Sequence, residues 1–258
     1  MKIGVIGLGL IGGSIFKKLS SLQKYELIGI SRNVNLENVT DDYSNIKGCD
    51  LVFVCTPMNK TLETLDKLDL ILESSTIVTD VCSLKEFVSK KNYSFKFIPS
   101  HPMAGTENSG WENSFAELFE GANWAVTLKD DTNLEDFAKL KDVINDLGAK
   151  TVMTTPQEHD KAVALISHAP MLVAQALCKN IEGNELAQQL ASSGFRDTTR
   201  LALSNTEMAN DMILMNHENV KDVIKMLNKN ADSLLSSKNY KNDAEEIKSL
   251  RQKMYVNV

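Results

Sequence analysis

The sequence predicts an α/β domain built on a parallel β-sheet over residues 1–154 and an all-α domain over residues 155–258. Three observations support this prediction. Short apolar runs alternate with helical patterns in the first part, which is typical of βαβ units. A glycine-rich turn follows the first apolar run, and after Thr155 only the helical spacing of apolar residues continues.

The apolar runs of the first part are expected to be buried strands. They are continuous rather than alternating, as in sheets that helices cover on both faces. We expect strands at residues 2–7, 26–30, 50–55, 75–79, 95–99, 122–127 and 150–153, a helix after the first strand, and another at 133–147.

The second part begins with Pro156, a residue that suits the first turn of a helix. Apolar residues from Val163 to Leu177 then recur at helical spacing, and further helices are expected at 184–192, 207–216, 218–237 and 241–255. So many apolar helix faces cannot all be buried within one chain. We therefore expect this domain to form a homodimer by burying them against a second subunit.

Composition excludes several classes of protein. The chain is 43% hydrophobic and 24% charged, as in soluble globular proteins, and its net charge of −6 argues against a nucleic-acid partner. No continuous apolar run reaches the roughly 20 residues of a membrane-spanning helix. The four cysteines form no C-x-x-C pair, so neither a metal site nor a disulfide framework is expected. The sequence thus predicts a cytoplasmic protein without a membrane partner.

A G-x-G-x-x-G motif joins the first strand to the first helix. In this position the first glycine allows a tight turn, the second lets the backbone approach a pyrophosphate, and the third lets helix and strand pack closely. The helix N-terminus offers free N–H groups to the phosphates. The motif predicts a Rossmann dinucleotide-binding domain, with the cofactor at Gly7, Leu8, Gly9, Leu10, Ile11 and Gly12.

The end of the second strand bears on the choice of cofactor. An Asp or Glu there would bind the ribose hydroxyls of NAD, but Ser31 and Arg32 follow the strand instead. A serine and an arginine suit a 2′-phosphate, so NADP is favoured over NAD. The alternative is a surface arginine in a turn.

Two more strand ends are expected beside the cofactor. Cys55, Thr56 and Pro57 follow one strand and Asp80 ends another, at the sheet edge where ligands bind in such folds. We assign all four residues to the cofactor site. Cys55 has no adjacent base and is given no chemical role.

His101 is the strongest candidate for chemistry, because it follows a strand at the same edge and is held between Ser100 and Pro102. Ser83 lies after another strand that leads to this edge. We expect Ser83 to hydrogen-bond His101 and fix its tautomer. The alternative is a structural histidine. His159 and His217 occur in charged helical segments and are expected at the surface.

Five motifs together make the prediction specific: G-L-G-L-I-G-G-S, T-D-V-C-S-L-K, S-H-P-M-A-G-T-E, I-S-H-A-P and G-F-R-D-T-T-R. In this order they resemble the prephenate/arogenate dehydrogenase family of tyrosine biosynthesis, over essentially the whole chain. That family oxidises a cyclohexadienol at the carbon bearing the 4-hydroxyl and passes hydride to NAD or NADP. Loss of the ring carboxylate as CO2 then makes the ring aromatic.

The resemblance also implies roles for individual residues. His101 would accept the hydroxyl proton, and Ser83 would orient the histidine and the hydroxyl. Arg200 would bind a substrate carboxylate through a bidentate pair. Further substrate-site residues implied in this way are Arg196, which would reach the neighbouring subunit's pocket, Thr106 and Glu107 as gate residues, and Ser167 and His168.

Two features bear on the kind of family member. The dinucleotide pattern starts at residue 2 and the helical part runs to Val258, so the resemblance implies a minimal, monofunctional form. Some relatives that use prephenate have S-H-x-P-H, with a second histidine where this chain has Met171. We therefore expect weak discrimination between prephenate and arogenate.

Two alternatives stay open at this point. One is another Rossmann-plus-helical oxidoreductase, of the hydroxy-acid dehydrogenase or pyrroline-carboxylate reductase type. The hydroxy-acid enzymes use a helix-borne lysine, for which Lys161 is the nearest candidate. The other is a non-catalytic NADP-sensing module, which would need the glycine loop but neither His101 nor Arg200.

Overall fold

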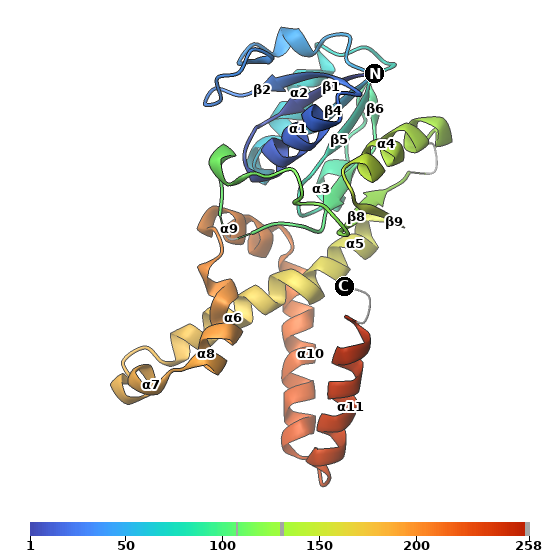
Figure 1. The fold of residues 1–258 in the computed structure, drawn as a ribbon. Helices are drawn as coiled ribbons and strands as arrows, with labels where there is room; N and C mark the ends of the chain where they lie inside the picture. The colour runs from blue at the N-terminus through green and yellow to red at the C-terminus, as the bar shows by residue number, and fades with distance from the viewer. Residues whose placement is uncertain (107, 130–131, 256–258) are drawn as a thin grey trace.

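The computed structural model describes residues 1–106, 108–129 and 132–255. An α/β domain forms one end of an elongated molecule, and helices extend from it in two directions (Figure 1). Its main sheet has the order β3-β2-β1-β4-β5-β6, and every neighbouring pair is parallel. The strands are β1 (Lys2–Ile6), β2 (Glu26–Ile30), β3 (Val39–Thr40), β4 (Leu51–Val54), β5 (Ile77–Asp80) and β6 (Lys96–Phe97).

Helices cover both faces of this sheet, as the continuous apolar strands require. On one face, α1 (Leu10–Leu22) and α4 (Leu134–Asp146) pack against alternate residues of β1 and β4, such as Val5 and Phe53. On the other face, α2 (Met58–Asp69) packs against the residues between them, such as Val54. The predicted α/β class is thus confirmed.

The last strands of the α/β domain form a second, mixed sheet that the sequence did not indicate. It contains β7 (Ser100–Pro102), β8 (Asn123–Thr127) and β9 (Lys150–Thr154), with β7 antiparallel to β8 and β9 parallel to it. Ile98 is still hydrogen-bonded to β5, whereas the carbonyl of Pro99 already accepts from Thr127. Pro99 has no N–H to continue the parallel ladder, so the chain changes sheets there.

The expectation that all the strands are buried on both faces is wrong for β9. Val152 and Met153 are 46% and 64% exposed, and because consecutive side chains of a strand point to opposite faces, neither face of β9 is fully covered there. The shorter elements of the α/β region are η1 (Tyr43–Ile46), α3 (Glu86–Ser89) and η2 (Trp111–Asn113).

The all-α part begins with one continuous helix made of α5 (Pro156–Val163), η3 (Ala164–His168) and α6 (Ala169–Asn180). Thr155 and Glu158 form a capping box at its start. The η3 segment is a π-helical turn, in which the N–H of Ala169 bonds to the carbonyl of Ala164. This wider turn lies just before Pro170, which has no N–H for the α-helical ladder.

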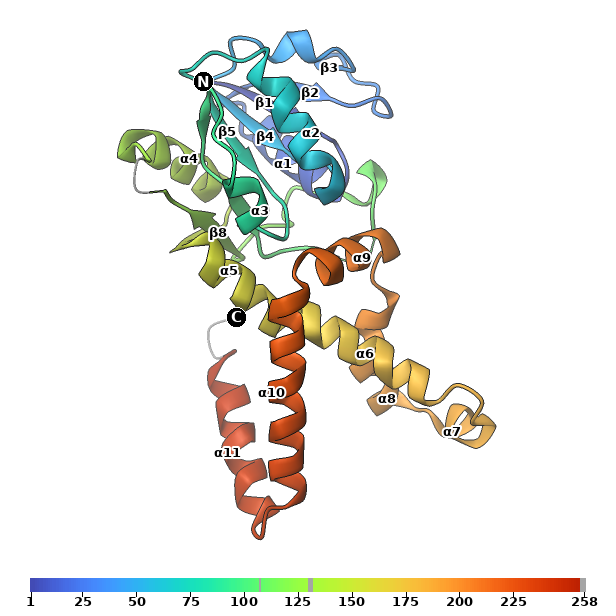
Figure 2. The ribbon, with the colours of Figure 1, turned by 180° about the vertical axis from the view of Figure 1, so that it is seen from behind.

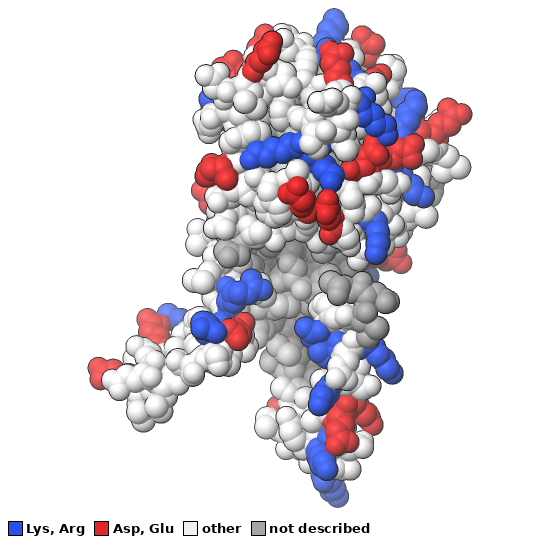
Figure 3. All heavy atoms as spheres, in the orientation of Figure 1, with Lys and Arg blue, Asp and Glu red and all other residues white. Residues whose placement is uncertain are grey.

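The remaining helices form two arms. One contains α7 (Glu185–Leu190), α8 (Ser193–Thr199) and η4 (Arg200–Leu203), and the other is the hairpin of α10 (His217–Leu235) and α11 (Tyr240–Lys253), with α9 (Thr206–Met215) between them (Figure 2). Large apolar side chains on these helices are exposed, among them Leu190, Leu203, Leu214 and Leu235. On the face drawn in Figure 3, charged side chains of both signs lie over the α/β domain and on the upper part of the arm of α7 and α8, whereas the lower end of that arm is mostly uncharged.

One helix in the described parts of the chain, Pro156–Asn180, is long and apolar enough to cross a membrane by length and composition alone. Polar residues such as His159, Asp160 and Lys161 interrupt its apolar residues, so no continuous apolar run marks it in the sequence. Its inner face carries His159, Asp160 and His168, which are buried and hydrogen-bonded to other parts of the protein. This face of the helix therefore packs against the rest of the same chain.

Candidate active site

The glycine loop has the geometry that a dinucleotide pyrophosphate needs. Gly7 has a φ of +87°, and a Cβ on Gly12 would lie 2.0 Å from the carbonyl oxygen of Gly7. A Cβ on Gly9 would meet no atom within 4 Å, so this glycine keeps an open space in front of the loop. Gly9 is also the N-cap of α1 and makes no side-chain cap, which leaves the first N–H groups of α1 for an anion.

The end of β2 carries no carboxylate at residues 31–33. Ser31 is half-buried and its hydroxyl oxygen accepts from the N–H of Asn33, at 3.3 Å. Arg32 is exposed, and no ion pair involves it among the described residues. Its guanidinium is thus available to a ligand phosphate.

The loop after β4 contacts the backbone of the glycine loop. A Cβ on Gly7 would lie 2.7 Å from the carbonyl oxygen of Cys55, so these two backbones are in contact. Burial raises the pKa of the Cys55 thiol, which keeps it protonated and unreactive. Thr56 is half-buried, and Pro57 is the exposed N-cap of α2.

Asp80 is at the expected edge, but its carboxylate is fully buried and faces the protein. It forms an ion pair with the equally buried Lys85 and accepts from the N–H groups of Cys82 and Ser100. Lys85 also donates to the carbonyl of Ser100, at 2.6 Å. Sequence reasoning did not identify Lys85. The Asp80–Lys85 pair holds the backbone immediately before His101.

Three strand ends converge here because of the sheet register. Ile6 of β1 pairs with Val54 of β4, and Val54 pairs with Asp80 of β5. The residue after each one therefore leaves the sheet at the same edge, and Asp80 ties β7 to it. His101 and the glycine loop belong to one edge of the domain.

The hydrogen-bond partner of His101 is not the residue that the sequence indicated. Nδ1 of His101 lies 3.0 Å from Nε2 of His159, and Nδ1 of His159 lies 2.8 Å from Oδ1 of Asp160. No hydrogen bond joins Ser83 to His101 within the described residues. The expected hydrogen bond from Ser83 to His101 is therefore not formed. The partner of His101 is His159, on α5.

His159 corrects a second expectation, because it is 3% exposed rather than on the surface. His217, by contrast, is exposed beside Glu218, as expected. The spacing of His159 from the apolar residues of its helix already indicated that His159 is buried. His159 is four residues before Val163, the first apolar position used to predict this helix, and residues four apart share a helix face.

The surroundings of His101 disfavour its charged form. Burial lowers the pKa of His101 well below its ordinary value, and His159, Lys85 and His168 contribute in the same direction. Burial also lowers the pKa of His168, to about 4. Both imidazoles are therefore neutral near pH 7. Neutral His101 can accept a proton.

The residues implied for the substrate lie on the helical part and on the loop after β7. Arg200 and Arg196 are exposed, and Arg196 pairs with Asp197 at 3.2 Å, while no ion pair involves Arg200 in the part of the chain that is described. Thr106 is exposed, and Glu107 lies outside the described residues. No hydrogen bond joins Arg200 to His101 among the described residues.

The helical residues near the domain junction are more buried. Ser167 is half-buried, and His168 is fully buried with Nδ1 3.2 Å from Nδ2 of Asn216. Met171 is 3% exposed and belongs to an apolar cluster between the domains. This cluster includes Met58, Cys82, Leu84, Val163, Ala209 and Met212, with Met103 packed against it.

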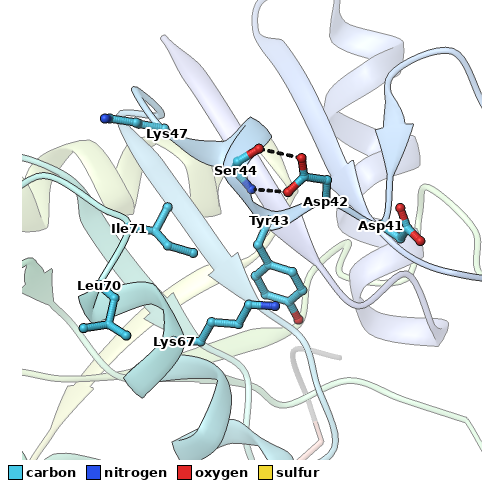
Figure 4. Close-up of a pocket in the computed structure, with 8 residues that line it drawn as sticks. All are labelled: Asp41, Asp42, Tyr43, Ser44, Lys47, Lys67, Leu70 and Ile71. Carbon is cyan, nitrogen blue, oxygen red and sulfur yellow. Dashed lines mark hydrogen bonds between the residues drawn. The ribbon is translucent and has the colours of Figure 1, made fainter.

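Two pockets in the described part of the chain lie away from His101 and the glycine loop. One, of about 420 Å³, lies between η1 and the end of α2 and contains none of the expected site residues (Figure 4). Lys67 lies 3.6 Å from the centre of the Tyr43 ring there. The other, of about 380 Å³, lies between α3 and the start of α10 and is bordered by Asp160 and Asn216.

Comparison with known families accounts for nearly the whole chain. Residues 23–153 match the nucleotide-binding domain of prephenate dehydrogenase, and residues 155–254 match the prephenate dehydrogenase dimerization domain. The prephenate dehydrogenase of Bacillus subtilis is 33% identical over 231 residues. These residues are 80% of this chain and 62% of that protein, so this chain spans less than two thirds of that relative's length.

Two solved structures share the complete architecture. The arogenate dehydrogenase of Synechocystis is 34% identical, with a TM-score of 0.81 over 98% of this chain and 97% of that one. The prephenate dehydrogenase of A. aeolicus, in complex with hydroxyphenyl propionate and NAD+, is 28% identical. Its TM-score is 0.89, over 98% of both chains.

Proposed function

The chain belongs to the prephenate dehydrogenase family, and we propose that it oxidatively decarboxylates prephenate, arogenate or both in tyrosine biosynthesis, with NAD(P) as the hydride acceptor. The observation that carries this proposal is a neutral, half-buried His101 at the same sheet edge as the glycine loop. Family membership sets aside the hydroxy-acid dehydrogenase alternative, and Lys161, its candidate catalyst, is exposed.

The proposed roles follow from the chemistry of the reaction. When bound, NAD(P) supplies the acceptor for the hydride that leaves the carbon bearing the 4-hydroxyl. His101 takes the hydroxyl proton at Nε2, since hydride loss alone would leave a high-energy protonated ketone. The electrons of the bond to the ring carboxylate then complete the aromatic ring, and CO2 leaves without an acid from the protein. Ser83 is proposed to orient the hydroxyl.

The remaining binding roles are part of the same proposal. The glycine loop, the β2 end and the loop at Cys55–Pro57 would hold the cofactor, and the buried Asp80 would support this edge rather than touch the ligand. Substrate binding is proposed for Arg200, Arg196, Thr106, Glu107, Ser167, His168 and Met171. Met171 can neither donate to a keto group nor repel an ammonium, which supports turnover of both substrates, with prephenate favoured as the physiological one.

We propose further that the chain acts as a homodimer in the cytoplasm. The match to a dimerization domain and the exposed apolar side chains of the helical part support the dimer. Cys49, Cys55, Cys82 and Cys178 are all free, as is typical of a reducing compartment. A boundary between 1–154 and 155–258 is supported by the end of β9 at Thr154 and the cap of α5 at Thr155.

An assay of nicotinamide reduction tests the function. The purified protein is mixed with NAD or NADP and with prephenate, arogenate or a 2-hydroxy acid, and absorbance of the reduced cofactor is followed. We expect turnover of both cyclohexadienols. Turnover of the hydroxy acid alone, or cofactor binding without any turnover, would contradict the proposal and favour one of the alternatives.

Replacing Arg32 with Ala is expected to weaken the binding of NADP more than the binding of NAD. The free guanidinium lies at the β2 end, where a 2′-phosphate would be bound, and no carboxylate there repels it. We expect NADP to be used at least as well as NAD before the change, and KM for NADP to rise on the order of 10-fold after it, from the loss of one charge-assisted contact.

The control for this change is Arg251→Ala, which removes an exposed arginine on α11. It should leave KM for NAD and KM for NADP unchanged. An equal rise of KM for NAD and for NADP in Arg32→Ala would show that the β2 end does not select a 2′-phosphate. A strong preference of the unmodified enzyme for NAD would show the same.

Replacing Arg200 with Ala is expected to raise KM for the cyclohexadienol on the order of 10- to 100-fold, because a charged hydrogen-bond pair to a carboxylate is lost. The carboxylate is present in both ground state and transition state, so kcat should change much less. Steady-state kinetics measure both constants, with Arg251→Ala again as the control. A fall in kcat at constant KM would assign Arg200 to the chemical step instead.

A further inference from the structure

Behind His101 lies a row of two more buried polar side chains, both from α5. His101 contacts His159, and His159 contacts Asp160, at 3.0 and 2.8 Å. His159 and Asp160 are 3% and 4% exposed. Both contacts are hydrogen bonds. Within the described ranges, no group of three or more His, Cys, Asp or Glu residues is arranged to hold a metal ion.

The backbone around Lys85 holds the far end of this row in place. Oδ1 of Asp160 accepts from the N–H of Lys85 at 2.8 Å, and Oδ2 accepts from the N–H of Glu86 at 2.9 Å. Two N–H donors stabilise the ionised carboxylate, which can only accept hydrogen bonds. The carboxylate therefore stays anionic and fixed in orientation.

The positions of the ring protons follow from this anion. Because Asp160 only accepts, Nδ1 of His159 must carry a proton, and its Nε2 must then present a lone pair. Nδ1 of His101 consequently donates to His159. This leaves the lone pair of His101 at Nε2, the ring nitrogen that makes no hydrogen bond among the described residues.

The charges around the two rings are unequal. Around His101 lie the ammonium of Lys85, which is paired with Asp80 at the end of β5, and the imidazole of His168 from η3. Around His159 lies the carboxylate of Asp160, from its own helix. A positive charge is disfavoured on His101 and stabilised on His159.

We propose that His159 and Asp160 form a positioning pair that fixes His101 as its Nδ1–H tautomer and takes over the proton that His101 removes from the substrate. This inference rests on the proposed function and deepens it. The substrate O–H bond breaks as a bond forms from its proton to Nε2 of His101. The Nδ1–H bond of His101 breaks as a bond forms to Nε2 of His159. His101 stays neutral, and the positive charge rests on His159 against Asp160.

The first test reads the tautomers without any substrate. The chain has only four histidines, so ¹⁵N spectra of the imidazole nitrogens can be assigned with His159→Gln, His168→Gln and His217→Gln. We expect that the uncharged imidazoles of His101 and His159 both carry their proton on Nδ1. A proton on Nε2 of His101 would overturn the proposal.

The second test is the kinetics of His159→Gln. The glutamine oxygen can accept from Nδ1–H of His101 and its NH2 group can donate to Asp160, so the orientation of His101 is kept but no proton can be taken over. We expect KM within about twofold and kcat lower on the order of 10²-fold, the range of general-base effects. Asp160→Asn should lower kcat in the same way, and the double variant should lose no more than either single one.

The pH profile separates this role from a merely structural one. In the unmodified enzyme the acid limb of kcat reports the His101–His159 pair, in which Asp160 stabilises a positive charge through its contact with His159. In His159→Gln only His101 can be protonated, and its pKa is low, so activity should persist to lower pH. His217→Gln, which alters an exposed histidine that likewise precedes an acidic residue, should change neither kcat nor the limb.

An unmoved acid limb with kcat within twofold of the unmodified enzyme would overturn the proposal. So would a loss of kcat that follows a loss of folded protein, measured by circular dichroism, with the limb unchanged. If the unmodified enzyme turns over neither cyclohexadienol, the proposed function fails, and the ¹⁵N spectra still decide the tautomers on their own.

Discussion

Replacing His101 with Asn is expected to lower kcat by about 10²- to 10⁴-fold, the usual contribution of a general base. Asparagine can keep a hydrogen bond to His159, but it offers no basic nitrogen to the substrate hydroxyl. Because the proton moves only in the transition state, KM should change little. Steady-state rates of cofactor reduction with prephenate and with arogenate measure both constants.

The control for this experiment is His217→Asn, since His217 is exposed and pairs only with neighbouring Glu218. It should have the kinetics of the unmodified enzyme. Retention of most of kcat by His101→Asn would remove His101 from the chemical step, whatever the effect of changes at Arg200.

Replacing Lys85 with Met should destabilise the protein by about 3–5 kcal/mol, the range for removing one member of a buried ion pair. Lys85 and Asp80 are both completely buried, and Met leaves the carboxylate of Asp80 without its cationic partner. Lys85 also donates to the carbonyl of Ser100, next to His101. We therefore expect a lower free energy of unfolding in urea and, in the protein that remains folded, a lower kcat.

A matched control is Lys91→Met, which breaks the half-exposed pair between Lys91 and Asp66 at 2.6 Å. Solvent screens that pair, so its loss should cost no more than about 1 kcal/mol. Adding Asp80→Asn to Lys85→Met removes the unpaired charge and should restore part of the stability. Equal effects of Lys85→Met and Lys91→Met would contradict the assignment of Lys85–Asp80 as a structural pair.

The sequence alone was sufficient for the features that depend on neighbouring residues. Continuous apolar runs predicted the strands of the parallel sheet except the two-residue β3, because a strand covered on both faces has no polar side. The order of strand, glycines and helix predicted the phosphate loop, since Gly7 and Gly12 are required by local backbone geometry. The helical spacing after Thr155 predicted the all-α part, whose apolar faces are exposed in one chain.

Only the tertiary structure decided which side chains meet across long stretches of sequence. The separation of β7 from the main sheet depends on where the chain changes partners at Pro99, and no periodicity records that. Asp80 was assigned to the cofactor because it ends a strand, whereas the folded chain encloses it with Lys85. His159 was expected at the surface because charged residues surround it in the sequence.

His159 shows the physical reason for these differences. Its neighbours along the chain set its helical conformation, but its burial comes from β7, 58 residues earlier. Asp160 likewise takes its two N–H partners from the start of α3, 74 and 75 residues away. Hydrogen bonds between segments so far apart depend on how the domains pack, so the sequence indicated His101 and only the folded structure revealed which residues contact it.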